Sequence, residues 1–262
     1  MMRQGEKHRS DPLYRLAIVL CAIFATSILH AEGEAEFLAG KAKQCRGCDL
    51  SDKRFKGRDF SQVDFSGANL RFSVFHRARL VSTKFDGADL TESNFNKTDL
   101  KSASLQKAKM SGIMLYEADL GLANLTGADL NNGKLGRIRL LRAKLDGAKI
   151  TNALMNESRL DEVTATGTDF SGTNLVNASF RRAKLAGASF DNAGLVSAQL
   201  RDADLRGVKF AEADLYDADL TGADCTGADF SGARLTRANL EGAKLDGAIF
   251  KGTLMPDGTE HE

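Results

Sequence analysis

The sequence predicts an all-β fold, a solenoid whose coils have four sides, and three observations support this prediction. The 262 residues include no Trp, 2 Pro and 25 Gly, a composition typical of a repeat protein. An apolar residue stands at every fifth position from Leu50 to Met255, without a change of phase. A small residue usually stands two positions before each of these centres.

The five-residue period determines the shape of the predicted coil. The 42 centres are all Leu, Phe, Met or Ile except Ala165 and Cys225, and 25 of the 37 positions two before a centre, from 68 to 248, are Ala. A period of five fits neither a helical stripe nor one alternating strand. It fits short extended segments joined by turns, in which each centre and the small residue before it point inward. Four sides give coils of about twenty residues and about ten coils, stacked at about 4.8 Å.

Recurring strings reveal the repeat unit. Examples are Ala88-Asp89-Leu90, Ala118-Asp119-Leu120 and Ala218-Asp219-Leu220. Over residues 48–255 the chain resembles the pentapeptide-repeat family, whose unit is A-(D/N)-L-x-x. The resemblance implies a right-handed quadrilateral β-helix. It implies little about function, because the members with known activities are few and differ from one another.

Residues 1–31 have the pattern of a secretory signal. A charged segment is followed by an apolar run from Leu16 to Leu29, with a cleavage site expected after Ala31. The run is shorter than the roughly 20 residues that span a membrane. We therefore expect a cleaved signal peptide, and an uncleaved membrane anchor is the alternative.

The rest of the chain divides into three parts. Residues 32–47 are expected to form a cap over the open end of the solenoid, with a short helix within 32–43. Residues 48–255 form the β-helix, and residues 256–262 are a C-terminal tail. The apolar residues of the expected cap are Ala35, Phe37, Leu38, Ala39 and Ala42.

Cys45 and Cys48 form a C-x-x-C motif where the repeats begin. No second Cys/His pair completes a zinc site, and export would favour a local disulfide. A reactive thiol pair and two unpaired thiols are the alternatives. Cys225 is a repeat centre, so we expect it to be buried as a small apolar residue.

No residue pattern indicates catalysis. The many Asp residues recur with the period and are expected to bind nearby backbone N–H groups instead of forming an acid–base pair. His76 is the only histidine within the repeats, and it occupies an outward position. We expect no enzymatic activity, no cofactor and no metal site.

Glycine is concentrated on one edge of the predicted rod. The position two after the centre is Gly in nine of ten coils from Gly67 to Gly247, with Lys107 as the exception. The third position of a type II turn needs a positive φ, which glycine adopts without strain. We therefore predict stacked turns along this edge, and strain or a different turn at Lys107.

A second face is the candidate partner-binding surface, because apolar residues fall at its outward positions. Incidental exposure is the alternative interpretation, since Lys97, Lys134, Asp214 and Arg234 interrupt the stripe. The candidate residues are Val74, Met114, Tyr116, Leu154, Val176, Val196 and Tyr216.

The net charge of +1 disfavours both a basic nucleic-acid binder and a uniformly acidic DNA mimic. Residues 32–150 carry a net +6, and residues 151–262 carry a net −7. This division predicts a dipolar rod. A dipolar rod could dock by one end or associate head to tail. The alternative interpretation is that the uneven charge arose by neutral drift at solvated positions.

Together these features predict an exported, non-catalytic scaffold that presents flat faces for protein–protein interaction. We expect a periplasmic or secreted bacterial protein with a protein partner, no direct nucleic-acid binding and no membrane contact after signal cleavage; self-association is a further expectation. The runner-up is a DNA-mimicking, gyrase-binding protein of the fluoroquinolone-resistance type. Acidity confined to residues 151–262, the export signal and the lack of a loop insertion count against it.

Overall fold

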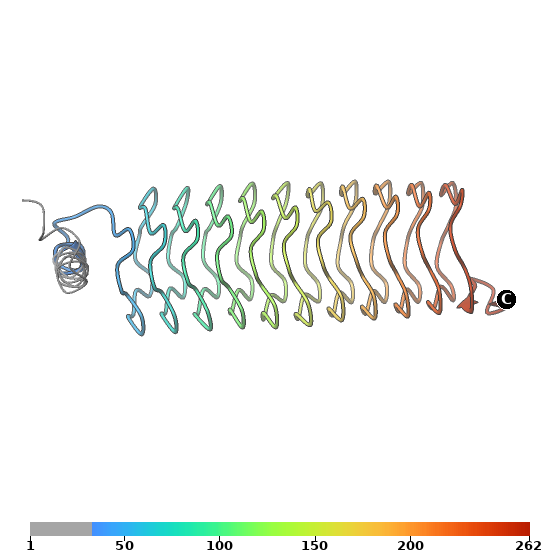
Figure 1. The fold of residues 1–262 in the computed structure, drawn as a ribbon, viewed down its shortest axis with the longest axis horizontal. Coiled ribbons are helices and arrows are strands. Elements are labelled where there is room, and N and C mark those ends of the chain that lie inside the picture. The colour runs from blue at the N-terminus through green and yellow to red at the C-terminus, as the bar shows by residue number, and fades with distance from the viewer. Residues whose placement is uncertain (1–32) are drawn as a thin grey trace, which may run out of the picture.

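The computed structural model describes residues 33–262, of which residues 44–254 stack as successive coils into a rod (Figure 1). The predicted signal peptide lies outside the described residues. Within residues 33–262, no helix is long and apolar enough to cross a membrane.

A continuous parallel ladder defines the coil. Each ladder residue pairs with the residue twenty positions later, from Gln44 with Asp64 to Arg234 with Leu254. Backbone hydrogen bonds join the same coils; for example, the Leu130 N–H donates to the Lys149 carbonyl at 2.7 Å. The predicted four-sided β-helix with twenty-residue coils is therefore confirmed.

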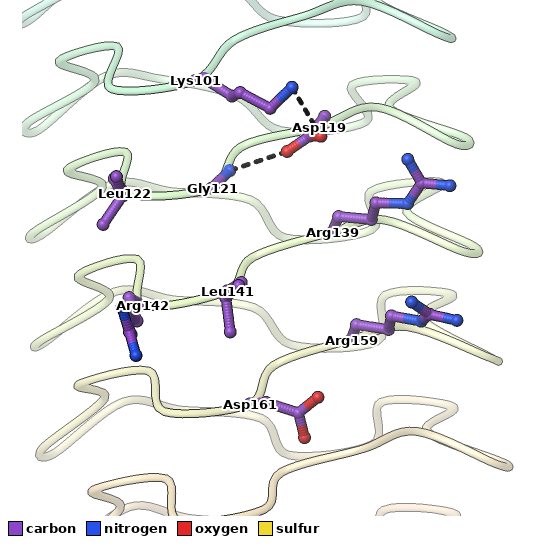
Figure 2. A pocket seen from close by; sticks show the side chains of 9 residues that line it. All are labelled: Lys101, Asp119, Gly121, Leu122, Arg139, Leu141, Arg142, Arg159 and Asp161. Atoms are coloured by element: carbon purple, nitrogen blue, oxygen red, sulfur yellow. Dashed lines mark hydrogen bonds and ion pairs between the residues drawn. The ribbon is translucent and has the colours of Figure 1, made fainter.

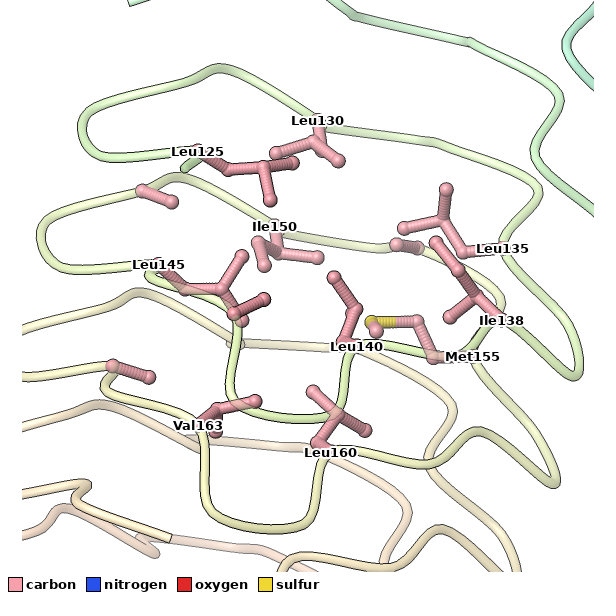
Figure 3. Close-up of a cluster of buried hydrophobic side chains, with 14 of the residues drawn as sticks. Leu125, Leu130, Leu135, Ile138, Leu140, Leu145, Ile150, Met155, Leu160 and Val163 are labelled. Carbon is pink, nitrogen blue, oxygen red and sulfur yellow. The ribbon is translucent and has the colours of Figure 1, made fainter. Parts of the chain in front are cut away.

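The repeat centres form the core. Every centre from Leu50 to Leu235 is buried, with an exposed fraction of at most 6%. Figure 3 shows centres such as Leu135, Leu140 and Ile150 filling one interior together. Ala165 and Val163 are both fully buried, as predicted for inward positions.

Some inward positions two before a centre carry Ser or Thr instead of Ala. The Ser73 hydroxyl donates to the Leu70 carbonyl at 2.6 Å, and the Thr168 hydroxyl donates to the Leu145 carbonyl at 2.7 Å. Among the described residues, every buried side-chain N or O atom has a hydrogen-bond partner. Because a satisfied hydroxyl avoids the desolvation cost of an unpaired one, these residues fit the core.

The turns differ from the sequence-based expectation. The position two after each centre from Leu50 to Phe250 has a positive φ, on all four edges, and most of these residues are not glycine. Lys107 has a φ of 55°, so it adopts the same backbone conformation as Gly87 and Gly127. A different turn at Lys107 was the wrong alternative; the backbone of Lys107 instead adopts the left-handed conformation, which is strained for a residue with a Cβ.

Outward Asp and Asn side chains secure the corners. The Asp129 carboxylate accepts a hydrogen bond from the Asn131 N–H at 3.1 Å, and Asp229 accepts both the N–H and the hydroxyl of Ser231. The Ser231 bonds hold the pKa of Asp229 below its usual value. The periodic carboxylates therefore stabilise turns, as the sequence predicted.

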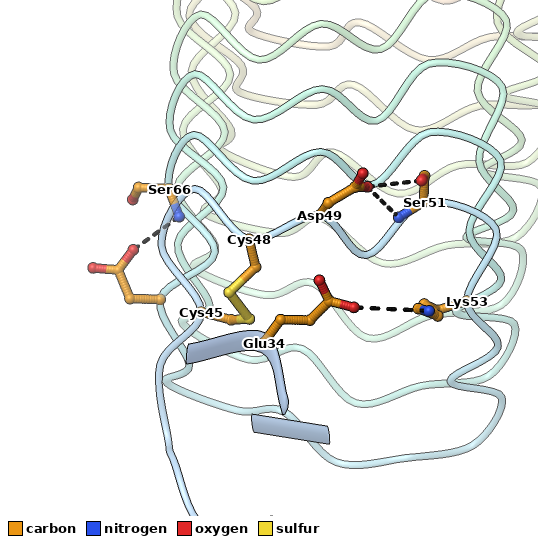
Figure 4. Close-up of a disulfide and its surroundings, with 8 residues drawn as sticks. Glu34, Cys45, Cys48, Asp49, Ser51, Lys53 and Ser66 are labelled. Atoms are coloured by element: carbon orange, nitrogen blue, oxygen red, sulfur yellow. Dashed lines mark hydrogen bonds and ion pairs between the residues drawn. A yellow bond between two sulfur atoms is a disulfide. The ribbon is translucent and has the colours of Figure 1, made fainter. Parts of the chain in front are cut away.

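The N-terminal end of the rod is covered. Residues 33–38 are helical, and Phe37 is buried against the rings of Phe60 and Phe65 at 5.7 and 5.4 Å. Glu34 pairs with Lys53 of the first coil at 3.7 Å (Figure 4). The helix thus shields the first apolar layer from solvent.

The C-terminal tail folds back and pairs with the end of the last coil. Strand β1 (Thr253–Leu254) pairs antiparallel with strand β2 (Glu260–His261). The His261 ring lies 5.8 Å from the ring of Phe250. The last coil is only partly covered, since Leu245 and Phe250 remain half-buried.

Candidate functional site

The predicted partner-binding surface has two parts. Val74, Met114 and Leu154 lie on one ladder in the middle of a face. Each is separated from the next by a polar ladder neighbour, Asn94 or Lys134. Leu154 is the most exposed of the three, at 50%. In this part the apolar side chains therefore stand apart from one another and do not form a continuous strip.

The second part follows the adjoining corner, where Val176, Val196 and Tyr216 stand on three successive coils. Val176 and Val196 are half-buried, and Tyr216 is packed below the guanidiniums of Arg234 and Arg237, at 4.8 and 5.6 Å from its ring centroid. This run is continuous along the rod.

Tyr116 lies on the same corner, separated from that run by two coils. Tyr116 is 38% exposed, and its hydroxyl accepts a hydrogen bond from Arg137 at 3.2 Å. The seven predicted residues are all outward, and the structure does not join them into one patch.

Cys45 and Cys48 form a disulfide, with an S–S distance of 2.05 Å (Figure 4). Between them, Arg46 contacts Asp64 of the next coil at 2.6 Å. The disulfide and the ion pair fix the chain where the ladder begins.

The surroundings of Cys225 and His76 do not indicate a reactive site. Burial, and to a lesser degree Asp224, raises the pKa of the Cys225 thiol to about 12, so this thiol is unreactive in the folded rod. Burial lowers the pKa of His76, and the nearby cations Arg77, Lys56 and Lys97 lower it further. Within residues 33–262, no group of three or more His, Cys, Asp or Glu side chains is placed to hold a metal ion.

Sequence reasoning missed a shallow groove on the next face. Leu122 and Leu141 are exposed along one side of it, and Arg139 and Arg159 stand on neighbouring coils at the other (Figure 2). The groove has a volume of about 320 Å³. The sequence already indicated that the two arginines are neighbours, because Arg139 and Arg159 are twenty residues apart. It did not indicate which charges are neutralised, because that depends on contacts between coils.

Comparisons with known proteins agree with the geometry of the repeats. A family described as Pentapeptide repeats matches residues 123–161, 166–198, 198–237 and 213–252, in eight copies. A second family, described as Pentapeptide repeat region, matches residues 43–115. No curated protein matches the chain.

Several solved structures are similar to the chain. HetL, a pentapeptide repeat protein involved in heterocyst differentiation regulation from Nostoc sp. strain PCC 7120, is 29% identical; the match covers 87% of this chain and 97% of HetL, with a TM-score of 0.40. QnrB1, a plasmid-mediated fluoroquinolone resistance protein, is 19% identical over 76% of this chain and 89% of its own, with a TM-score of 0.48. A pentapeptide repeat protein from the Arabidopsis thaliana thylakoid lumen is 28% identical over 43% and 65%, with a TM-score of 0.30.

Proposed function

Because the chain belongs to the pentapeptide-repeat family, we propose that it is an exported, non-catalytic scaffold that presents a flat face to a protein partner. The observation that carries this proposal is the set of outward apolar side chains around Leu154 and along the corner from Val176 to Tyr216. Apolar side chains aligned along one face of a rod gain free energy when a partner covers them.

Two features support export. Residues 1–31 have the charge and hydropathy pattern of a secretory signal. The bonded pair of Cys45 and Cys48 suits an oxidising compartment, where such bonds persist.

Cell fractionation tests the export step. The full-length chain is expressed, and the N-terminus of the exported material is determined by mass spectrometry. We expect a start near Glu32. An intact Met1 on exported material would contradict cleavage and favour the membrane anchor.

Site-specific photo-crosslinking tests the face. A photoreactive residue replaces Leu154 or Val176 in separate variants, and Lys144 on the opposite face serves as the control position. We expect crosslinks to envelope proteins from the first two positions and not from the third. Equal crosslinking from all three positions, or crosslinks to gyrase, would overturn the proposal.

A further inference from the structure

The groove between Leu122, Leu141, Arg139 and Arg159 differs from the rest of the surface in its charge pairing; we call it the Arg139–Arg159 groove. In the ladder of the described residues, three neighbouring pairs carry like charges. Like charges directly opposite each other on adjacent strands destabilise a sheet unless they are neutralised. The three pairs are Asp99–Asp119, Asp204–Asp224 and Arg139–Arg159.

Both acidic pairs have counter-charges. The ammonium of Lys101 lies 3.8 Å from Asp99 and 3.2 Å from Asp119, so one cation serves both carboxylates. The second acidic pair is neutralised by Arg206 and Lys244, at 2.7 and 3.4 Å. The rod therefore compensates like-charged neighbours where they are acidic.

The arginine pair has no such compensation. Within residues 33–262, the guanidiniums of Arg139 and Arg159 take part in no salt bridge or side-chain hydrogen bond, and both side chains are exposed. Figure 2 shows them projecting side by side from successive coils. The other charged residues of the groove are paired: Asp119 with Lys101 at 3.2 Å, Asp161 with Arg181 at 3.1 Å and Arg142 with Glu162 at 2.7 Å.

The opposite side of the groove is apolar. Leu122 is 63% exposed and Leu141 is 48% exposed. The two residues are adjacent across coils, since the Leu122 N–H donates to the Leu141 carbonyl at 2.9 Å. Leu122 also has a positive φ of 62°, a conformation that disfavours a branched side chain. Neither leucine contributes to the core, so the fold alone does not account for them.

We propose that the Arg139–Arg159 groove binds an acidic amphipathic helix of a protein partner. Neighbouring coils are about 4.8 Å apart, and residues i and i+4 of a helix about 5–6 Å apart, so two carboxylates on one helix face reach both guanidiniums. Arginine binds carboxylates through well-oriented, charge-assisted hydrogen bonds. Leucines on the adjoining stripe of the helix cover Leu122 and Leu141. A nucleic acid would satisfy the arginines and leave the leucines uncovered.

This inference goes beyond the proposed scaffold function, because it concerns a different face from that of Leu154. It holds whether or not that face has a partner. The charge complementarity arises from two unneutralised guanidiniums, and the apolar contact arises from two exposed leucines beside them.

The test uses a synthetic helical peptide of about four turns, with Glu at i and i+4 and Leu at i+3 and i+7. Binding to the folded rod is measured by fluorescence anisotropy. Arg139→Ala with Arg159→Ala removes the arginine pair. The matched control is Lys109→Ala with Lys149→Ala, which removes the same charge from the opposite face. Circular dichroism checks that each variant is folded.

We expect the arginine double variant to weaken binding by about tenfold or more, and the lysine control to change it by less than about twofold. Replacing Glu by Gln in the peptide should reproduce the loss. Leu122→Ser with Leu141→Ser should weaken binding by about fivefold or more.

Three results would overturn the proposal. The wild-type rod could fail to bind the peptide saturably, or the two double variants could lose affinity equally, as for non-specific charge attraction. A duplex DNA oligonucleotide could bind more tightly than the peptide, with a loss of affinity specific to Arg139→Ala and Arg159→Ala. The last result would assign the groove to nucleic acid.

Discussion

The middle coils (residues 96–169) and the C-terminal coils (residues 170–252) share one backbone and differ inside. The middle coils contain no phenylalanine, and their core consists of Leu, Ile, Met, Val and Ala side chains with a few buried Ser and Thr residues. In the C-terminal coils, phenylalanines stack in one column from Phe170 to Phe250, with ring centroids 4.8 to 5.3 Å apart. The ladder pairs residues twenty apart in both regions. The backbone therefore accepts either interior, provided that each layer is filled.

The two regions also differ at their turns. Four of the fifteen positive-φ corner positions in the middle coils are glycine, against nine of seventeen in the C-terminal coils. Non-glycine residues in the left-handed region cost free energy. The middle coils thus combine an aliphatic core with more strained corners, and the like-charged arginines lie on the same coils. The comparison indicates that the C-terminal coils are the more stable part of the rod.

The largest expected effect tests the stacked column. Phe210 lies between Phe190 and Phe230, at 5.3 and 5.1 Å. We expect Phe210→Ala to reduce the free energy of unfolding by about 3–5 kcal/mol, and Leu130→Ala in the middle coils by about 2–5 kcal/mol, because a stacked wall cannot collapse into the cavity. Denaturant unfolding followed by circular dichroism measures both. A larger loss for Leu130→Ala would reverse the ranking of the two interiors.

The next effect concerns the boundary between the regions. Val163 is larger than the usual Ala, Ala165 is smaller than the usual Leu or Phe, and both are fully buried; we infer that the first compensates for the volume that the second lacks. We expect Ala165→Leu alone to cost about 1–3 kcal/mol through overpacking. Ala165→Leu with Val163→Ala should be neutral or stabilising. Denaturant unfolding measures both variants. If Ala165→Leu alone stabilises the rod, this layer contains a void, and Val163 does not compensate for the small side chain of Ala165.

A smaller effect tests the strain at the corners. Lys107 has a φ of 55°, and Gly147 has a φ of 64° with open space where an added Cβ would lie. We expect Lys107→Gly to stabilise the rod by about 0.5–1 kcal/mol, and Gly147→Ala to destabilise it by about 1 kcal/mol. Thermal melts of the two variants provide the measurement. If Lys107→Gly has no effect, the middle coils do not carry the strain that we assign to them.

The smallest effect is a pH dependence in the middle coils. Burial by itself raises the pKa of Asp161. Hydrogen bonds from Arg181 and Ser179, together with the charge of Arg181, lower it by more than burial raises it, so the pKa lies below its usual value of 3.8. A depressed pKa stabilises the folded state above the unfolded-state value, and the contribution disappears as the pH falls through the folded value. We expect Asp161→Asn to cost about 1 kcal/mol or less near neutral pH.

Unfolding measured across acid pH checks this sign. The difference between the wild type and Asp161→Asn should stay constant down to about pH 5 and shrink below about pH 4. A difference that grows toward acid pH would contradict the assigned direction.

The repeat centres and the small residues before them predicted the coil length, the four sides and the inward residues, because side-chain direction alternates along each short segment. The positive φ at Lys107 and at the other non-glycine corners was not predictable from residue type, since hydrogen bonds between coils impose that conformation. The Arg139–Arg159 groove was missed for a related reason. A list of outward residues shows which charges are stacked, but only contacts such as Lys101 with Asp119 show which are neutralised.

The register of the ladder makes the position of each outward residue depend on the number of residues that precede it. Because each side is five residues and each coil is twenty, inserting or deleting five residues between Arg139 and Arg159 would leave every centre pointing inward and rotate all downstream faces by a quarter turn. The burial of the core would hardly change, yet Arg159 would no longer stand beside Arg139. Only length changes of whole coils preserve the alignment of binding residues, so selection on a face acts as selection on length in steps of twenty.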